Sequence, residues 1–187
     1  MFQSILDNEV RLRPYRLDDA PELFELTAQS RNHLRRWLGW VDHTQTVEDS
    51  ASFISFTLQG TVDNGGYPKV AAIIYRDRIA GTIGFNEVNK TNRTGTIGYW
   101  LGEPYQRKGI MSKALGAYLR YGYEDLGLNR IEIRAATGND RSRALPLRFG
   151  FKEEGTIRQA EWLYDRYVDH VVYGLLKSEW LQNQTKL

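Results

Sequence analysis

The sequence predicts a single mixed α/β domain over residues 1–187, with one mixed, mostly antiparallel sheet of roughly six to seven strands flanked by helices. Three observations predict this class. The length of 187 residues is typical of one domain, and no linker marks a second. Apolar, β-branched runs at 69–75, 79–88 and 94–101 are joined by short polar connections, which favour an antiparallel meander. A helical pattern then separates 94–101 from 130–137, so these two strands should be parallel.

The N-terminal part combines a strand with helices. Residues 9–16 alternate in polarity as a strand does. Asp18 or Asp19 is placed to cap a helix whose first turn contains Pro21. Residues 31–40 have the pattern of a second, short helix that ends near Gly39.

Signals for the next helix lie between residues 37 and 66. Thr46 and Asp49 resemble a capping box ahead of an apolar helical run, and Asn64-Gly65-Gly66 is a break. Trp37 and Trp40 precede this helix and fit two interpretations: packing aromatics, as large aromatic side chains usually are, or the lining of a substrate opening.

The C-terminal third returns to strands. After the strand at 130–137, Asn139 opens a short helix that ends at Gly150. Residues 151–158 and 167–177 supply the last two strands.

Composition excludes several classes of protein. The chain has no cysteine, which rules out disulfides, thiolate metal sites and an acyl-cysteine intermediate. A formal charge of +2 with interspersed acids and bases gives no concentrated basic face, so we expect no direct nucleic-acid recognition. No apolar run approaches the ~20 residues of a membrane span, and the N-terminus lacks the pattern of a signal peptide. We therefore expect a cytoplasmic protein with no membrane partner.

The segment around residues 94–116 has the properties of an anion site. Gly102-Glu103-Pro104 ends the strand 94–101, and the turn Gln106–Met111 leads directly into a helix. The first N–H groups of a helix lack internal acceptors and carry partial positive charge, so a diphosphate can bind there. The turn fits neither G-x-x-x-x-G-K-[ST] nor G-x-G-x-x-G. A solvated basic turn is the alternative that spacing alone leaves open.

Gln106-x-x-Gly109 resembles the acetyl-CoA pyrophosphate loop of the GNAT N-acetyltransferases, whose pattern is Q/R-x-x-G-x-G/A. Met111 departs from it, standing where Gly or Ala is usual. The strand IGYWL and the later run GNDRSRALPLRFGFKEEG resemble the branch that acetylates ribosomal-protein N-termini. The resemblance covers nearly the whole chain. It implies the GNAT fold with a splayed parallel strand pair, acetyl-CoA as cofactor and CoA as product.

The resemblance also implies which residues bind the cofactor. The backbone at the end of the strand 94–101 should pair with the pantetheine arm, and one N–H should point at the thioester oxygen. Asn139 should bond the arm, although an isolated Asn-x-x-Ser is usually only a helix cap. The implied cofactor-binding residues are Trp100, Leu101, Gln106, Arg107, Lys108, Gly109, Ile110, Met111, Asn139 and Ser142, with no metal.

Two residues are implied for proton transfer. Ser142 would protonate the departing thiolate, and Glu161, in an R-Q-A-E stretch expected to be a loop after the strand beginning at Phe151, would take the amine proton through water. A solvated surface glutamate is the alternative for Glu161. The competing bases are His33, His43 and His170. Without a cysteine, direct attack in a ternary complex is the mechanism we expect.

The expected acceptor is a protein N-terminal α-amine, above all that of a ribosomal protein. The alternatives are a small amine (a polyamine, an amino acid or an aminoglycoside) and a non-catalytic CoA-binding or ribosome-associated module. The further partners we expect are a weak association with the ribosome and a second copy of the chain, in a homodimer.

Overall fold

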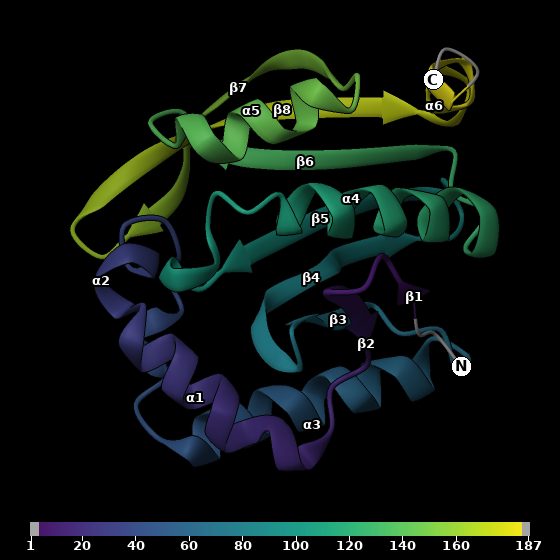
Figure 1. Cartoon of the computed structure of the whole chain (residues 1–187). Helices are drawn as coiled ribbons and strands as arrows, with labels where there is room; N and C mark the ends of the chain where they lie inside the picture. The colour runs from purple at the N-terminus through teal and green to yellow at the C-terminus, as the bar shows by residue number, and fades with distance from the viewer. Residues whose placement is uncertain (1–3, 185–187) are drawn as a thin grey trace. The chain divides into compact units, whose positions relative to one another are not determined.

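The computed structural model describes residues 4–184 (Figure 1). These residues form two compact units. The first unit contains the described residues up to Gly84 together with Tyr99–Ala117, and the second contains Phe85–Gly98 and the chain from Tyr118 onward. Each unit therefore combines segments that are far apart in the sequence. The expectation of one domain for the whole chain stays a prediction.

The strands of the first unit pair antiparallel in chain order. β1 (Ser4–Ile5) pairs with β2 (Val10–Arg13), β2 with β3 (Val70–Tyr75), and β3 with the first part of β4 (Arg78–Asn89). β3 and β4 meet at a two-residue turn, in which Arg76 and Asp77 have φ of 46° and 65°. Positive φ at both positions matches the twist of a tight hairpin, so the short polar connection acts as the sequence predicts.

Two helices pack against these strands. α1 (Ala20–Gln29) and α3 (Val47–Asp63) lie side by side in Figure 1 and contact one another. Their apolar faces bury a cluster that joins both helices to β3 and β4. Its fully or nearly buried members are Tyr15, Ala20, Leu23, Leu26, Ile54, Ala72, Ile74 and Ile79.

The start signals of these helices differ in outcome. The predicted capping box of α3 is confirmed: the Asp49 N–H donates to Thr46 Oγ1, and the Thr46 N–H donates to Asp49 Oδ2. Asp19 occupies the position before α1 but makes no side-chain cap bond there. Its carboxylate instead accepts from the Arg16 N–H at 2.7 Å and pairs with Arg13, so the predicted capping role of Asp19 is wrong.

The region between α1 and α3 is less helical than expected. α2 covers only Arg31–Leu34, followed by turns and a short 3-10 helix at Val41–His43. The predicted helix over 31–40 is therefore wrong beyond Leu34. Arg31 fixes the irregular segment, because its guanidinium donates to the carbonyls of Val41 at 2.7 Å and Thr44 at 2.6 Å.

The second unit contains one parallel and two antiparallel strand pairs. β5 (Thr94–Leu101) pairs in parallel with β6 (Arg130–Ala136), from Thr94 opposite Arg130 to Ile97 opposite Ile133. β8 (Arg166–Leu176) pairs antiparallel with β6 on one side and with β7 (Lys152–Leu163) on the other. The predicted parallel pair is thus confirmed, and β7 is an edge strand.

Helices complete the second unit. Its core contains the end of α4 (Ile110–Arg120), the π-helical turn Tyr121–Asp125 and α6 (Lys177–Gln184). The Tyr123 hydroxyl donates to the Leu175 carbonyl at 2.8 Å and its ring packs on Trp180. α5 (Asp140–Arg148) packs against β6 and β8, as Figure 1 shows.

The strands form one mixed, mostly antiparallel sheet in the order β1-β2-β3-β4-β5-β6-β8-β7. The predicted fold class is confirmed, but the sheet has eight strands rather than six or seven. The additional strand, β1, has two residues, and such a short pairing leaves no periodic pattern in the sequence.

Candidate active site

The predicted anion-binding turn has the geometry of a strand-to-helix connection. A short 3-10 helix, Glu103–Tyr105, follows β5, and α4 begins at Ile110. The Lys113 N–H donates to the Gly109 carbonyl at 3.2 Å, which makes this the first bond of α4. The N–H groups ahead of it have no acceptor within the helix, which is the arrangement that binds anions at helix starts.

Two residues of this turn have left-handed backbone conformations. Gly109 has φ of +70° and Arg107 has φ of +61°. Nothing lies within 4 Å of a Cβ added to Gly109, so its glycine is needed for the backbone conformation and not for space. The strained conformation of Arg107 is a feature that the sequence did not indicate, because arginine rarely adopts it.

The basic side chains of the turn are exposed. Lys108 Nζ lies 5.5 Å from the ring centre of Tyr75 and 5.9 Å from that of Tyr105. The two tyrosine rings pack edge to face, 6.1 Å apart. A cation over aromatic faces is held in place while its charge stays accessible, which suits an attraction to phosphate.

Asp7, from the turn between β1 and β2, contacts the first turns of α4. The Lys113 ammonium bonds to its carboxylate, and the N–H groups of Glu9 and Val10 also donate to it. These bonds, that of Lys113 foremost, lower the pKa of Asp7 to about 2. Lys113 therefore forms an ion pair with Asp7, and we do not count its charge among those of the turn.

The segment around α2 braces the turn from within the same unit. Ser30 Oγ accepts the Glu103 N–H at 3.0 Å, and the side chains of His33 and Gln106 contact one another. His33, a competing base in the sequence, thus lies beside the predicted pyrophosphate turn. Trp40 packs on Trp100 with ring centres 5.6 Å apart, which supports its interpretation as a packing aromatic.

The end of β5 lies close to β4. Gly102 donates its N–H to the Ala80 carbonyl at 2.9 Å, and a Cβ on Gly81 would lie 2.1 Å from the Trp100 carbonyl oxygen. Any side chain at Gly81 would displace the backbone of Trp100 and Leu101. The close approach therefore fixes the stretch predicted to face the thioester.

In the second unit, Asn139 caps α5 as predicted. Its Oδ1 accepts the Ser142 N–H at 3.2 Å, and Ser142 lies in the first turn of the helix. Arg143 holds the preceding loop, because its guanidinium donates to the Thr137 carbonyl at 2.9 Å and to the Tyr173 hydroxyl at 3.0 Å. The helix start is thus rigidly attached to the sheet.

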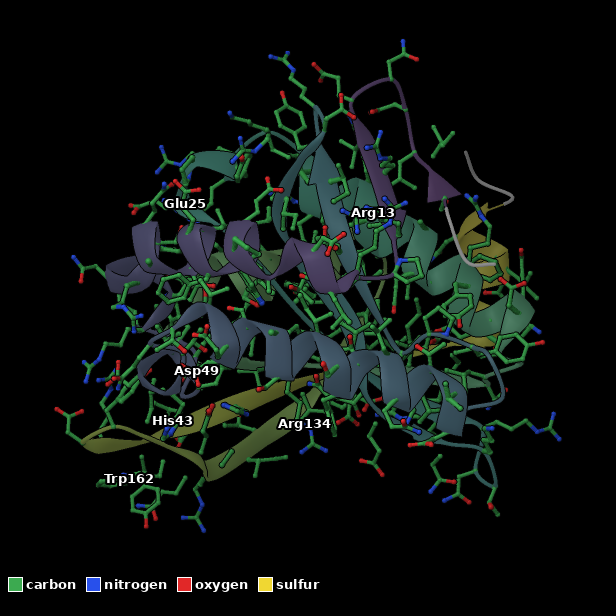
Figure 2. All side chains as sticks on the ribbon, turned by 90° about the horizontal axis from the view of Figure 1, so that it is seen from below. Arg13, Glu25, His43, Asp49, Arg134 and Trp162 are labelled. Carbon is green, nitrogen blue, oxygen red and sulfur yellow. The ribbon has the colours of Figure 1, made fainter. Side chains whose placement is uncertain are left out.

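Glu161 lies within β7, so its predicted placement on a loop after the strand is wrong. β7 continues to Leu163 because an irregularity after Ile157 restores pairing with β8 at Glu161. Glu161 Oε2 lies 3.1 Å from His170 Nε2. The next residue, Trp162, projects outward from the hairpin (Figure 2) and packs on Tyr167.

The predicted site residues thus fall into two groups. Trp100, Leu101 and the turn Gln106–Met111 belong to the first unit, whereas Asn139, Ser142 and Glu161 belong to the second. Sequence reasoning missed the pairing of Glu161 with His170, and treated the two as competitors. Strand pairing brings them together, and no local signal in the sequence could have shown it.

Two kinds of feature are absent from the described residues. Among residues 4–184, no group of three or more His, Asp or Glu side chains is arranged to hold a metal ion. In that same part of the chain, no helix has the length and apolarity needed to cross a membrane.

Comparisons with known proteins show the family of this chain. Residues 9–152 match the family model described as Acetyltransferase (GNAT) domain. The Escherichia coli (strain K12) ribosomal-protein-serine acetyltransferase is 36% identical over 154 residues, which are 81% of this chain and 84% of that protein.

Two solved structures are similar over most of both chains. The microcin C7 self immunity acetyltransferase MccE, in complex with acetyl-CoA and AMP, has a TM-score of 0.84 and 32% identity, covering 91% of this chain and 94% of its own. The ribosomal L7/L12 alpha-N-protein acetyltransferase RimL, in complex with coenzyme A, has a TM-score of 0.87 and 27% identity, covering 94% and 98%. The chain therefore belongs to the GNAT acetyltransferases and is an N-acetyltransferase that uses acetyl-CoA.

Proposed function

We propose that the protein acetylates the N-terminal α-amine of a protein, most specifically a ribosomal protein. One observation carries this choice of acceptor: the similarity, over more than four fifths of both chains, to an enzyme named as a ribosomal-protein-serine acetyltransferase. An α-amine has a pKa of about 7.7–8.0, so it needs little help to reach the neutral, nucleophilic form near neutral pH.

We propose that the cofactor is held by groups from three segments. The N–H groups of the turn Gln106–Met111 bind the pyrophosphate, and Arg107 and Lys108 add positive charge. The backbone at Trp100 and Leu101 pairs with the pantetheine arm and donates to the thioester oxygen, where negative charge develops. Asn139 bonds the arm.

The proposed reaction is a direct transfer. The neutral amine attacks the thioester carbonyl, a C–N bond forms, and the C–S bond breaks. The amine proton passes through water to Glu161, and Ser142 gives a proton to the leaving thiolate. Ser142 then regains a proton from water, and Glu161 releases its proton to solvent. The absence of cysteine from the sequence favours this route over an acyl-cysteine intermediate.

Thiol release from acetyl-CoA tests the acceptor. The assay compares peptides with a free N-terminal Ser or Ala, the same peptides blocked at the N-terminus with an internal Lys left free, and a panel of polyamines, amino acids and aminoglycosides. We expect release only with the free N-terminal peptides. Turnover confined to the small amines would reject the proposed acceptor, and cofactor binding without any turnover would reject catalysis.

The predicted homodimer, ribosome association and cytoplasmic location stay predictions.

Initial-rate kinetics test the route separately. Varying both substrates should give intersecting lines, as a ternary complex requires. Parallel lines together with an isolable acetyl-enzyme would contradict direct transfer.

A further inference from the structure

The hairpin of β7 and β8 contains a large irregularity beside Glu161. Ile157 pairs with His170 and Glu161 pairs with Val168, so three residues of β7 oppose Asp169 alone. Those three residues are Arg158, Gln159 and Ala160. Extra residues in one strand re-aim the side chains that follow, and such bulges are common next to active sites. The bulge therefore determines where the Glu161 carboxylate points.

Asp169 holds the bulge in a strained conformation. Gln159 has φ of +50°, and its N–H donates to Asp169 Oδ1 at 2.7 Å. The carbonyl of Asp169 accepts the Thr137 N–H at 2.9 Å. Asp169 thus connects the bulge to the end of β6, just ahead of the segment that carries Asn139 and Ser142.

The side chain of His170 contacts the carboxylate of Glu161. Its backbone lies in β8 between Ala136 of β6 and Ile157 of β7, so both sides of the strand are paired. Its Nε2 lies 3.1 Å from Glu161 Oε2, and the two side chains are 19% and 36% exposed. An ionised carboxylate can only accept, so this bond requires a proton on Nε2.

We propose that His170 is a positioning residue for Glu161, an inference that rests on the proposed function. Its ring holds Oε2 through a hydrogen bond and so keeps the long, flexible glutamate side chain in one arrangement before the amine arrives. Pre-ordering of this kind raises the rate of the chemical step rather than the affinity for acetyl-CoA.

Two substitutions separate positioning from direct proton transfer. His170→Ala removes the donor. His170→Gln keeps an N–H donor at similar reach but cannot take up a proton, so it distinguishes a positioning residue from a base. Glu154→Gln is the matched control: it weakens an ion pair with Arg130 elsewhere on the same hairpin without touching Glu161.

The measurements are kcat and KM with acetyl-CoA and an N-terminal Ser peptide for the wild type, these variants, Glu161→Gln and the double variant His170→Ala/Glu161→Gln. We expect His170→Ala to lower kcat about tenfold with KM for acetyl-CoA unchanged. His170→Gln should recover most of the loss, and Glu154→Gln should match the wild type. In the Glu161→Gln background, His170→Ala should have no further effect, because the two residues act as one unit.

Nitrogen-15 NMR of the histidine rings provides a readout besides activity. We expect the His170 tautomer with the proton on Nε2 in the wild type, and a shifted resonance in Glu161→Gln. The His170 variants lack this resonance, so the backbone amide resonances of β7 and β8 show whether each hairpin variant is folded.

Several results would overturn the inference. If the wild type is active but His170→Ala matches it, His170 positions nothing while the proposed function stands. If His170→Gln is as inactive as His170→Ala, or the two losses add in the double variant, His170 acts on its own, as a base would. If the wild type turns over no amine at all, the proposed function fails and the role of His170 fails with it.

Discussion

The turn at 106–111 and the bulge before Glu161 acquire their conformations in different ways. The turn is encoded locally: strand, break, glycine and helix follow one another in the sequence, and the structure has them in that order. The bulge depends on how β7 pairs with β8, on an aspartate ten residues away, and on a positive φ at Gln159. The proposed cofactor loop could therefore be predicted from local sequence, whereas the surroundings of the proposed base depend on strand register and require the structure.

If the turn binds the cofactor and the bulge places the base, as proposed, changes in the bulge should lower kcat and changes in the turn should raise KM for acetyl-CoA. The largest expected effect is that of Glu161→Gln. Loss of a general base should lower kcat about 10³-fold, with KM for acetyl-CoA unchanged. The defect should be greatest below pH 8, where the α-amine is mostly protonated. A pH–rate profile checks this, and an unchanged profile would remove Glu161 from the role of base.

Gly81→Ala should have the next largest effect. Its Cβ would lie 2.1 Å from the Trp100 carbonyl oxygen and 2.9 Å from the Leu101 Cα, so backbone must move. We expect a loss of about 2–3 kcal/mol in the free energy of unfolding, measured by urea denaturation. Gly60→Ala is the control, because its Cβ meets nothing within 4 Å in α3. That change should stabilise by about 0.5–1 kcal/mol. Equal effects of the two substitutions would contradict the close approach of β4 and β5.

Asp19→Asn tests stability at a place that belongs to neither the turn nor the bulge. Burial alone would raise the pKa of Asp19, but its bonds with Arg13 and the Arg16 N–H outweigh burial and leave the pKa below its usual value. A lowered pKa in the folded state stabilises the protein above the unfolded-state pKa, and this contribution disappears as pH falls through the folded-state value.

We expect Asp19→Asn to cost about 2 kcal/mol at pH 7, since it removes charged hydrogen bonds from a largely buried arginine. The difference from wild type should shrink below pH 4. Urea denaturation across pH checks this, with the exposed neighbour Asp18→Asn as control. A penalty that persists at low pH would show that the carboxylate charge is not its source.

The smallest effect is expected in the turn. Gly109→Ala has room for its Cβ, so its cost is that of a left-handed alanine, about 1 kcal/mol. Without cofactor the turn can relax from this conformation, and binding must then restore it. KM for acetyl-CoA should therefore rise about fivefold while kcat stays within twofold. Gly127→Ala is the matched control, because Gly127 has φ of +65° and equal room for a Cβ but lies outside the turn, so KM should not change. A fall in kcat without a change in KM would place Gly109 in the chemical step and contradict its proposed role in cofactor binding.

The features of the fold that could be predicted from the sequence are those encoded locally or by the length of a connection. The capping box of Thr46 and Asp49, the break at Asn64-Gly65-Gly66 and the parallel pairing of β5 with β6 rest on local signals or on connection length, and all are found. The helix predicted over 31–40 ends at Leu34 instead. The Arg31 guanidinium donates to the carbonyls of Val41 and Thr44, and these bonds stabilise an irregular chain after the helix.

The candidate site divides likewise. Asn139 and Ser142 are found at the start of α5 as expected, because an Asn cap has a sequence signature. The partnership of Glu161 with His170 has none: His170 pairs in the sheet with Ile157, and only the extra residues of the bulge bring Glu161 to its side. Contacts of this kind depend on non-local pairing, which a single sequence does not display.

The position of the transferred acetyl group shows whether the protein acetylates an N-terminal α-amine. Isotope-labelled acetyl-CoA would be incubated with the protein and a peptide that carries both a free N-terminal Ser and an internal Lys, and tandem mass spectrometry would locate the label. We expect one label, on the α-amine, formed about 10³-fold more slowly by Glu161→Gln. A label on the lysine side chain, or labelling that Glu161→Gln does not slow, would contradict the proposed function.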